Sequence, residues 1–296
     1  MNILLIGSSN TDMVVKTQKL PAPGETVIGG TFLMNPGGKG ANQAVAAARL
    51  GAHVRLVAKV GNDLFGEQAV EGFQKEGIDT TAIVKDDGPS GVALITVDDK
   101  GENCIVVAPG ANSNLQPDEV EAAIDACLPG DIVLLQLEIP LATVEHAIRK
   151  SAQRGLRVIL NPAPAQRLPL DLLSHLHLIT PNETEAELLT GIPVTEDNVG
   201  RVARALQDMG VTNVVITLGA KGAYILSSEF EGTVGGVAVQ AVDSTAAGDC
   251  FNGALAVGMA EGLSLPEAVG FACKAAAISV TRLGAQSSMP HRHEVS

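Results

Sequence analysis

The chain has 296 residues, of which 46% are hydrophobic, and a formal net charge of −13. This length and apolar content are enough for one large α/β domain or two smaller ones. The acidic excess argues against nucleic acid as a partner, because phosphate backbones are bound by excess Lys and Arg. No apolar run reaches the length of a membrane span, and the N-terminal run is too short for a signal peptide, so we expect a cytoplasmic protein.

Apolar β-rich runs alternate with helical patterns along the chain, which predicts an α/β fold in three layers, with a mainly parallel central sheet between helices. Buried strands are expected at residues 3–6, 54–60, 132–137, 158–160, 176–180 and 214–218, with a strand-like stretch at 235–242. Two regions, 10–33 and 90–107, break the alternation and predict additional β strands. We expect a single domain over residues 1–296, with these two regions forming a small β lid over the ligand crevice.

The first informative motif is Pro36-Gly-Gly-Lys-Gly-Ala-Asn42, which leads into an Ala-rich helix expected at 43–50. A Walker A assignment fails, because Gly40 follows Lys39 where a P-loop needs Ser or Thr for magnesium. The glycines allow backbone to approach a ligand closely, and Lys39 and Asn42 can donate hydrogen bonds to hydroxyl oxygens. The alternative is a glycine-rich helix entry that binds nothing.

The second motif, Asp243-Ser-Thr-Ala-Ala-Gly-Asp249, opens a helix whose apolar face carries Phe251, Leu255 and Met259. Small side chains allow the backbone N–H groups at this helix start to converge on an anion. A carboxylate at Asp249 would then suit a general base. The alternative is that Asp249 only caps the helix.

Together these motifs resemble the signatures of the ribokinase family of carbohydrate kinases, and the resemblance covers essentially the whole chain. The first signature is matched by Gly37 to Asn42 followed by Ala44, Gly51 and Gly61, and the second by Asp243 to Leu255 without a break. The resemblance implies ATP-dependent phosphorylation of a sugar, most closely D-ribose at its 5-hydroxyl. Asp249 would be the base, and the backbone of Ala246, Ala247, Gly248 and Asp249 would form the anion hole.

The resemblance also implies a sugar site at the ends of the predicted strands, where open α/β sheets bind ligands. Asp12 would accept hydrogen bonds from adjacent sugar hydroxyls, and Glu138 would orient another. The remaining possibilities are a turn Asp that caps its own backbone and a solvated strand end. The implied sugar-binding residues are Asn10, Asp12, Gly38, Lys39, Gly40, Asn42, Glu138 and Asp249.

For the nucleotide, the segment after the strand at 214–218 matches the family's phosphate and ribose contact loop, although an ordinary hairpin turn has the same pattern. Asn182-Glu-Thr-Glu185 matches the family's magnesium motif, with Glu185 holding waters of the metal shell, but it also spells a helix capping box. The implied nucleotide-binding residues are Asn182, Thr217, Leu218, Gly219, Ala220, Lys221, Gly222, Gly248, Asp249 and Cys273. Cys273 departs from the Asn or His usual in the family.

A potassium site is implied by the resemblance alone, beside the anion hole. Its ligands would be the Asp243 carboxylate, the Ser288 hydroxyl and the backbone oxygens of Thr245, Ser279, Arg282 and Gly284. Backbone ligands are indifferent to sequence, so this region also fits a simple loop after the last helix.

Other functions are open to the same fold. Six Phe, one Tyr and no Trp disfavour a nucleoside kinase, which stacks a purine on aromatic rings. Lys39 is the only base in the proposed sugar motifs, which disfavours fructose 6-phosphate; 2-deoxyribose differs from ribose by one hydroxyl and stays open. A ribose sensor without catalysis is the alternative from another class. We expect a homodimer formed through the apolar outer face of the lid.

Overall fold

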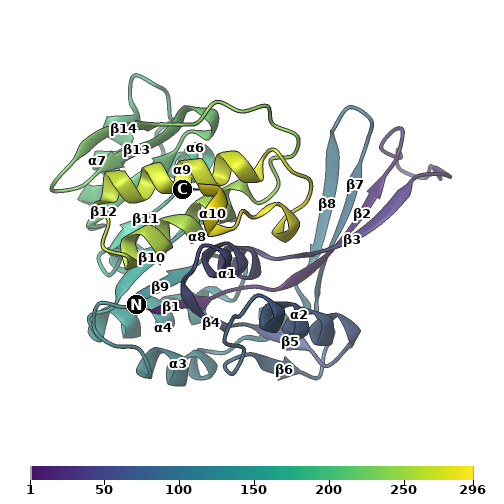
Figure 1. Cartoon of the computed structure of the whole chain (residues 1–296), viewed down its shortest axis with the longest axis horizontal. Coiled ribbons are helices and arrows are strands. Elements are labelled where there is room, and N and C mark those ends of the chain that lie inside the picture. The colour runs from purple at the N-terminus through teal and green to yellow at the C-terminus, as the bar shows by residue number, and fades with distance from the viewer. Residues whose placement is uncertain (1, 296) are drawn as a thin grey trace.

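The computed structural model describes residues 2–295, and in this part of the chain an eight-stranded sheet lies between two layers of helices (Figure 1). The strand order is β14-β13-β12-β11-β10-β9-β1-β4. Six strands are parallel: β1 (Asn2–Ile6), β4 (His53–Val57), β9 (Ile132–Leu135), β10 (Arg157–Leu160), β11 (Leu178–Ile179) and β12 (Asn213–Thr217). The last two, β13 (Gly222–Leu226) and β14 (Glu231–Gly235), are antiparallel. The predicted fold class is confirmed.

Alternating side chains of the buried strands build one apolar core on each face of the sheet. In β1, Ile3 and Leu5 belong to one core, and Leu4 and Ile6 belong to the other. The helices of the first core are α1 (Lys39–Arg49), α2 (Leu64–Lys75), α8 (Ala247–Ala260), α9 (Leu265–Ser279) and α10 (Arg292–Val295). Those of the second are α3 (Glu121–Asp125), α4 (Leu141–Gln153), α5 (Leu170–Leu173), α6 (Glu183–Thr190) and α7 (Val199–Asp208).

A separate four-stranded sheet projects from this body (Figure 1). Its order is β3 (Thr31–Gly37), β2 (Asn10–Lys16), β7 (Gly91–Val97) and β8 (Asn103–Ala108). The two regions that break the helix–strand alternation supply these strands, so the small sheet is confirmed. Strand β3, which precedes α1, ends at Gly37, four residues beyond the expected boundary at residue 33.

Two strand predictions are wrong. The run at 54–60 is not one strand: β4 ends at Val57, and β5 (Lys59–Gly61) pairs with β6 (Val84–Asp86) in a two-stranded sheet. Because β4 is an edge strand, the chain can leave the main sheet without breaking an inner ladder. The stretch 235–242 is also not a strand, since β14 ends at Gly235 and the following residues are exposed. β14 is also an edge strand, so beyond Gly235 no neighbouring strand pairs with the chain.

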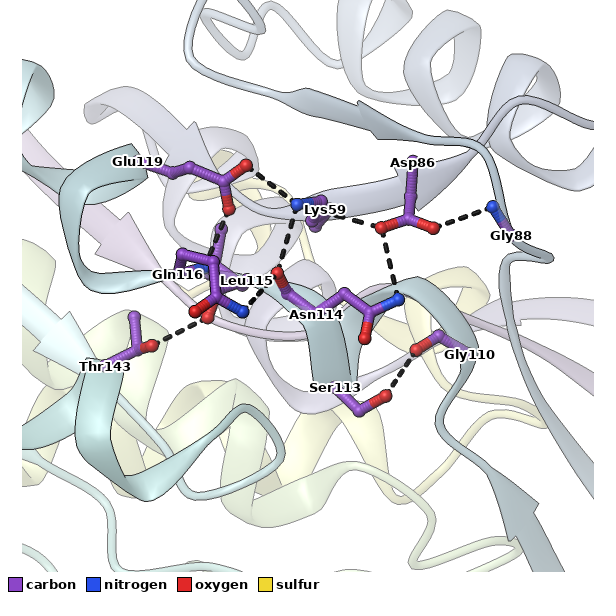
Figure 2. Close-up of polar contacts among 10 residues, drawn as sticks. All are labelled: Lys59, Asp86, Gly88, Gly110, Ser113, Asn114, Leu115, Gln116, Glu119 and Thr143. Atoms are coloured by element: carbon purple, nitrogen blue, oxygen red, sulfur yellow. Dashed lines mark hydrogen bonds and ion pairs between the residues drawn. The ribbon is translucent and has the colours of Figure 1, made fainter.

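An ion cluster around the buried Lys59 lies at the base of the four-stranded sheet (Figure 2). The Lys59 ammonium donates to Glu119 Oε1 at 2.7 Å and to the Asn114 carbonyl at 3.0 Å, and lies 3.7 Å from Asp86 Oδ2. Asp86 also accepts hydrogen bonds from the Gly88 amide at 2.7 Å and from Asn114 Nδ2 at 3.2 Å. The segment before β7 and the 3-10 turn η1 (Gly110–Asn114) after β8 are therefore tied together.

Across residues 2–295, no helix has the length and apolar character needed to cross a bilayer.

Candidate active site

At the carboxyl ends of the parallel strands, the motif at residues 36–42 lies next to Glu138. Ser8, just after β1, donates its hydroxyl to Glu138 Oε2 at 2.6 Å, and the Lys39 amide donates to the same oxygen at 3.0 Å. Gly40 has no room for a side chain, because a Cβ would lie 2.6 Å from the backbone of Gly7 and Ser8. Glu138 is half-buried and holds the motif by hydrogen bonds, so it is not a solvated strand end.

Asp249 lies in the first turn of α8 with its carboxylate facing α1. Asn42 Nδ2 donates to its Oδ2 at 2.9 Å, and Gln43 Nε2 donates to its Oδ1 at 3.0 Å. Ala246, not Asp249, occupies the N-cap position, so the capping alternative is wrong. Burial raises the pKa of Asp249, while Lys39 and the two amide donors act in the opposite direction.

Lys39 stands among four carboxylates. Burial lowers the pKa of its ammonium, but the fields of Asp249, Glu138, Glu185 and Asp12 outweigh that effect and raise it. Lys39 is therefore a permanent cation in a site with excess negative charge. Such a site suits a ligand rich in hydroxyl donors, or an anion that arrives with its own cation.

Asp12 and Asn10 lie in β2, at the base of the projecting sheet. Asp12 pairs with Asn35 of β3 and its carboxylate lies over Gly37, where a Cβ would come within 2.4 Å of it. Since Asp12 is a strand residue, it is not the self-capping turn Asp. Burial, together with the charges of Glu138 and Asp249, raises its pKa to about 6. The structure thus brings the predicted sugar-binding side chains into one electrostatic cluster.

The start of α8 has the backbone form that an anion site needs. Ala246 has φ 58°, a left-handed conformation that costs a non-glycine residue roughly 1 kcal/mol. The Ala247 amide donates to the Ser244 carbonyl at 3.2 Å, so it is already engaged. The amides of Gly248 and Asp249 follow in the first turn, before helical carbonyls become available. A Cβ at Gly248 would meet nothing within 4 Å, which leaves the space over this turn open.

The two predicted nucleotide segments lie side by side. Asn182 forms a parallel bridge with Thr217, and the Thr217 amide donates to the Pro181 carbonyl at 2.9 Å. The segment 218–221 links the antiparallel strands β12 and β13, so the hairpin reading is also correct. Its Lys221 is exposed and ion-paired with Glu196. Cys273 instead belongs to the apolar core on α9, and burial raises the pKa of its thiol to about 11.

Glu185 and Asn182 form the capping box of α6. The backbone amide of Asn182 donates to Glu185 Oε2 at 2.8 Å, and the backbone amide of Glu185 donates to Asn182 Oδ1 at 2.8 Å. Glu185 is nonetheless within the field of Lys39 and Asp249, and burial raises its pKa. The capping interpretation is therefore correct, and the same carboxylate also interacts electrostatically with Lys39 and Asp249.

Two residues of the expected potassium site, Thr245 and Gly284, contact the Asp243 carboxylate. Its Oδ1 accepts from the Thr245 amide and its Oδ2 from the Gly284 amide, both at 2.9 Å. Burial raises the pKa of Asp243, but these hydrogen bonds outweigh it and hold the pKa below the usual value. The Ser288 hydroxyl is fully buried and donates to the Ala285 carbonyl at 2.8 Å. The Arg282 amide donates to the Ser279 carbonyl at 3.0 Å, which closes the loop.

Sequence reasoning missed a set of amide side chains around the site. They are Gln43, Asn112, Gln136 and Asn161, all 7% exposed or less. Asn112 Nδ2 donates to Asn10 Oδ1 at 2.8 Å, and its Oδ1 accepts from the Ser9 amide at 2.8 Å. Gln136 and Asn161 directly follow β9 and β10, so the rule that ligands lie beyond the carboxyl ends of strands would have found them.

Known proteins resemble the chain over its full length. The family model described as pfkB family carbohydrate kinase matches residues 1–292. A ribokinase from Haemophilus influenzae is 46% identical over 99% of this chain and 96% of its own length. A deoxyribokinase from Salmonella typhi is 40% identical, with 98% and 96% covered. The structure of Arabidopsis thaliana ribokinase complexed with ribose and ATP covers 99% of this chain and 96% of its own, with a TM-score of 0.90 and 33% identity.

The fold is that of ribokinase structures, and the chain belongs to the pfkB family of carbohydrate kinases. It is a phosphotransferase with an alcohol group as acceptor.

Proposed function

We propose that this kinase transfers the γ-phosphoryl group of ATP to the 5-hydroxyl of D-ribose. The observation that carries the proposal is the Asp249 carboxylate, held by Asn42 and Gln43 at the open N-terminus of α8. That arrangement sets a base between a hydroxyl-binding cluster and an anion site. Similarity to named ribokinases, one of them solved with ribose and ATP, supports the choice of sugar and donor.

In this proposal Asp249 takes the proton of the attacking hydroxyl as the phosphoryl group is transferred. The amides of Gly248 and Asp249, with the positive end of α8, stabilise the charge that develops on the phosphoryl oxygens. Ala246 and Ala247 shape this turn. The sugar is held by the cluster around Asp12, Lys39, Asn42 and Glu138, with Asn10, Gly38 and Gly40 completing its walls.

The nucleotide lies, in this proposal, along the segment Thr217, Leu218, Gly219, Ala220, Lys221 and Gly222, next to Asn182. Mg²⁺ fits the donor set, since Glu185 offers a buried carboxylate toward the anion site and the ion otherwise binds water and phosphates. When bound, it neutralises charge between the terminal phosphates. Cys273 offers packing to the nucleotide and no charge.

A potassium ion fits the loops around Asp243, because the available donors are all oxygens. The ligands would be Asp243, Thr245, Ser279, Arg282, Gly284 and Ser288. The ion would supply fixed positive charge beside the anion site.

We also infer that residues 1–296 form one kinase domain whose four-stranded sheet acts as a lid. The lid carries Asp12, so its position decides whether the sugar cluster is complete. It also exposes apolar side chains on both faces: Val15, Phe32, Leu33, Met34, Leu94, Ile105, Val106 and Val107. Pairing of two lids would bury them and give a homodimer.

Phosphorylation of 2-deoxyribose is the second candidate, favoured by the 40% identity to a deoxyribokinase. The two sugars differ in one hydroxyl, and Asp12 and Glu138 can serve both. A ribose sensor without catalysis is a weaker candidate, because binding alone needs no base beside an anion site.

The test is ADP release from magnesium-ATP with D-ribose, 2-deoxyribose, fructose 6-phosphate and adenosine, each in potassium and in sodium alone. Strong ribose turnover that rises with potassium is expected. Preference for another acceptor would keep the kinase and overturn the sugar. Sugar binding without ADP release would favour the sensor.

A further inference from the structure

Gln43 is completely buried on α1, and every polar atom of its side chain is engaged. Nε2 donates to Asp249 Oδ1 at 3.0 Å and to Asn161 Oδ1 at 3.0 Å. Oε1 accepts from Gln136 Nε2 at 2.6 Å. Its neighbour Asn42 differs, since Asn42 Oδ1 is buried without a partner in residues 2–295. Asn42 therefore has an atom left for a ligand, whereas Gln43 faces protein only.

The contact to Asn161 continues into a chain of hydrogen bonds that returns to α8. Asn161 Nδ2 donates to the Thr180 carbonyl at 3.3 Å, and the Thr180 hydroxyl donates to Asn252 Oδ1 at 2.5 Å. Asn252 Nδ2 donates to the Gly248 carbonyl at 2.8 Å. Asn161 and Thr180 directly follow β10 and β11, so the first turn of α8 is anchored to the ends of two central strands.

Gln136, which follows β9, holds the other side of Gln43. A Cβ at Gly7 would lie 2.1 Å from Gln136 Oε1, so only glycine leaves room for this amide. The position of Gln43 is thus fixed from α1, from Gln136 and from Asn161 at once. A carboxylate that accepts one fixed donor on each oxygen cannot rotate without leaving buried donors unpaired, which is unfavourable.

We propose that Gln43 is a positioning residue, which sets the plane of the Asp249 carboxylate and couples it to the anion-binding turn of α8. The inference rests on the proposed role of Asp249 as the base. Asn42 holds Oδ2 and Gln43 holds Oδ1, so one lone pair remains on each oxygen, in a carboxylate plane that the two donors fix. Gln43 also donates to the ionised form of Asp249 and thereby favours the state that can accept a proton.

The test compares Gln43→Met with Gln136→Met. Both variants remove one buried amide of equal size, but only the first removes a donor to Asp249. We expect kcat to fall about 10- to 100-fold in Gln43→Met, the effect of losing one hydrogen bond to a charged group. The loss in Gln136→Met should be smaller, because Gln43 then keeps its hydrogen bonds to Asp249 and Asn161. KM for the sugar should change less than about 3-fold in both. The acidic limb of the kcat profile should move to higher pH in Gln43→Met alone.

The ¹³C titration of the Asp249 carboxyl carbon gives a readout that needs no turnover, and it should show a raised pKa in Gln43→Met only. Should Gln43→Met not fold, Gln43→Glu keeps the side-chain volume and is expected to raise the pKa of Asp249 further, because a second carboxylate repels its ionised form, with a larger loss of kcat. Equal losses of kcat in Gln43→Met and Gln136→Met, or an unmoved titration, would overturn the proposal. A different preferred sugar would overturn the proposed substrate alone, because the variants are compared with whichever acceptor the wild type uses.

Discussion

At the scale of single residues, the site is built from a conflict between burial and charge. Asp249 is 6% exposed, and burial alone would favour its protonated form. The nearby Lys39 ammonium and two amide donors lower the pKa of Asp249 but do not cancel the effect of burial, so the pKa stays above its ordinary value. The protonation state of Asp249 therefore depends on its neighbours. Substitutions around it are expected to act by changing its pKa.

Replacement of Asp249 by Asn keeps the side-chain volume and removes the base. We expect kcat to fall by about 10² to 10⁴, because general base catalysis contributes that much, while sugar affinity stays within a few fold. Steady-state kinetics and calorimetric sugar binding measure the two quantities. Asp171→Asn is the control, since that carboxylate is exposed and pairs with Arg149 far from the cluster. Turnover within a few fold of wild type would remove Asp249 from the role of base.

Asp12 predicts a stability that depends on pH. Its pKa in the folded protein is about 6, above the ordinary 3.8. Between these values the folded protein retains a proton that the unfolded chain has lost, so this contribution to stability falls as pH rises and is lost above pH 6. Asp12→Asn should therefore be more stable than wild type at pH 7, by ~1–2 kcal/mol after allowance for solvent, and equal below pH 4.

Thermal melts of wild type and Asp12→Asn across pH 4 to 7 measure that difference. The same variant should lose sugar affinity, because Asn presents only one acceptor oxygen. A constant difference in melting temperature across the range would contradict the assigned burial of Asp12.

At the scale of elements, helices α1 and α8 meet at backbone distance. A Cβ at Gly253 of α8 would lie 2.7 Å from Ala46 Cβ and 2.7 Å from the Gln43 carbonyl. This close approach is what lets Asn42 and Gln43 of one helix reach Asp249 of the other. Small residues along α1 are thus a condition for the site as well as for the core.

Gly253→Val should force the two helices apart. We expect a loss of ~1–3 kcal/mol in the free energy of unfolding from overpacking, together with a lower kcat. Denaturant unfolding and kinetics measure the two effects. Gly270→Ala in α9 is the matched control, because a Cβ there meets only Val234 Cγ1 at 3.9 Å and a helical Gly→Ala change is stabilising. If Gly253→Val were as stable and active as wild type, the close contact would not matter.

Sequence patterns predict the strands of the main sheet better than they predict the point at which the chain leaves it. Six buried strands and the additional strands are visible as apolar runs, but periodicity cannot show that β5 leaves the main sheet after Val57. The helix α1 begins at Lys39, four residues before the expected start, because Gly38 with φ 88° supplies the turn that precedes it. Charged site residues stand out in motifs. The uncharged Gln43 does not, since its role depends on which helices and strand ends converge, whereas Asn161 could have been found only from its place after a strand.

At the scale of the whole molecule, the four-stranded sheet that we propose as a lid is held at its base by an ion cluster around Lys59. Lys59 is 8% exposed and joins Asp86, before β7, to Glu119 and to the backbone after β8 (Figure 2). Both ends of the β7–β8 hairpin are therefore held by one ammonium group. Removal of one partner leaves the others as uncompensated charges.

Lys59→Met should lower the free energy of unfolding by about 1–3 kcal/mol, the range for loss of hydrogen bonds to a charged group whose partners water can reach. We also expect a higher KM for the sugar with a smaller change in kcat, since the lid carries Asp12 while Asp249 is held by α1 and α8. Lys150→Met is the control, because that ammonium pairs with Glu121 and Asp125 away from the lid. A loss of stability with no change in sugar KM would separate the cluster from the lid.

Assembly is the last property that the lid should control. Cross-strand pairing puts Leu94 on one face of the lid with Met34 and Val106, whereas Ile105 is on the opposite face, with Leu33. Leu94 and Ile105 are 51% and 52% exposed, so an aspartate at either position is tolerated by the isolated chain but not inside an apolar interface.

Leu94→Asp and Ile105→Asp, made separately, should therefore identify the face that pairs. Light scattering is expected to show twice the chain mass of 30.4 kDa for wild type and the single mass for one of the two variants. Leu170→Asp, at a 66% exposed position on α5, is the control and should remain a dimer. A monomeric wild type, or two variants that both stay dimeric, would exclude the lid as the interface. If the monomeric variant also needs more sugar for half-maximal rate, pairing of the lids orders the strand that carries Asp12.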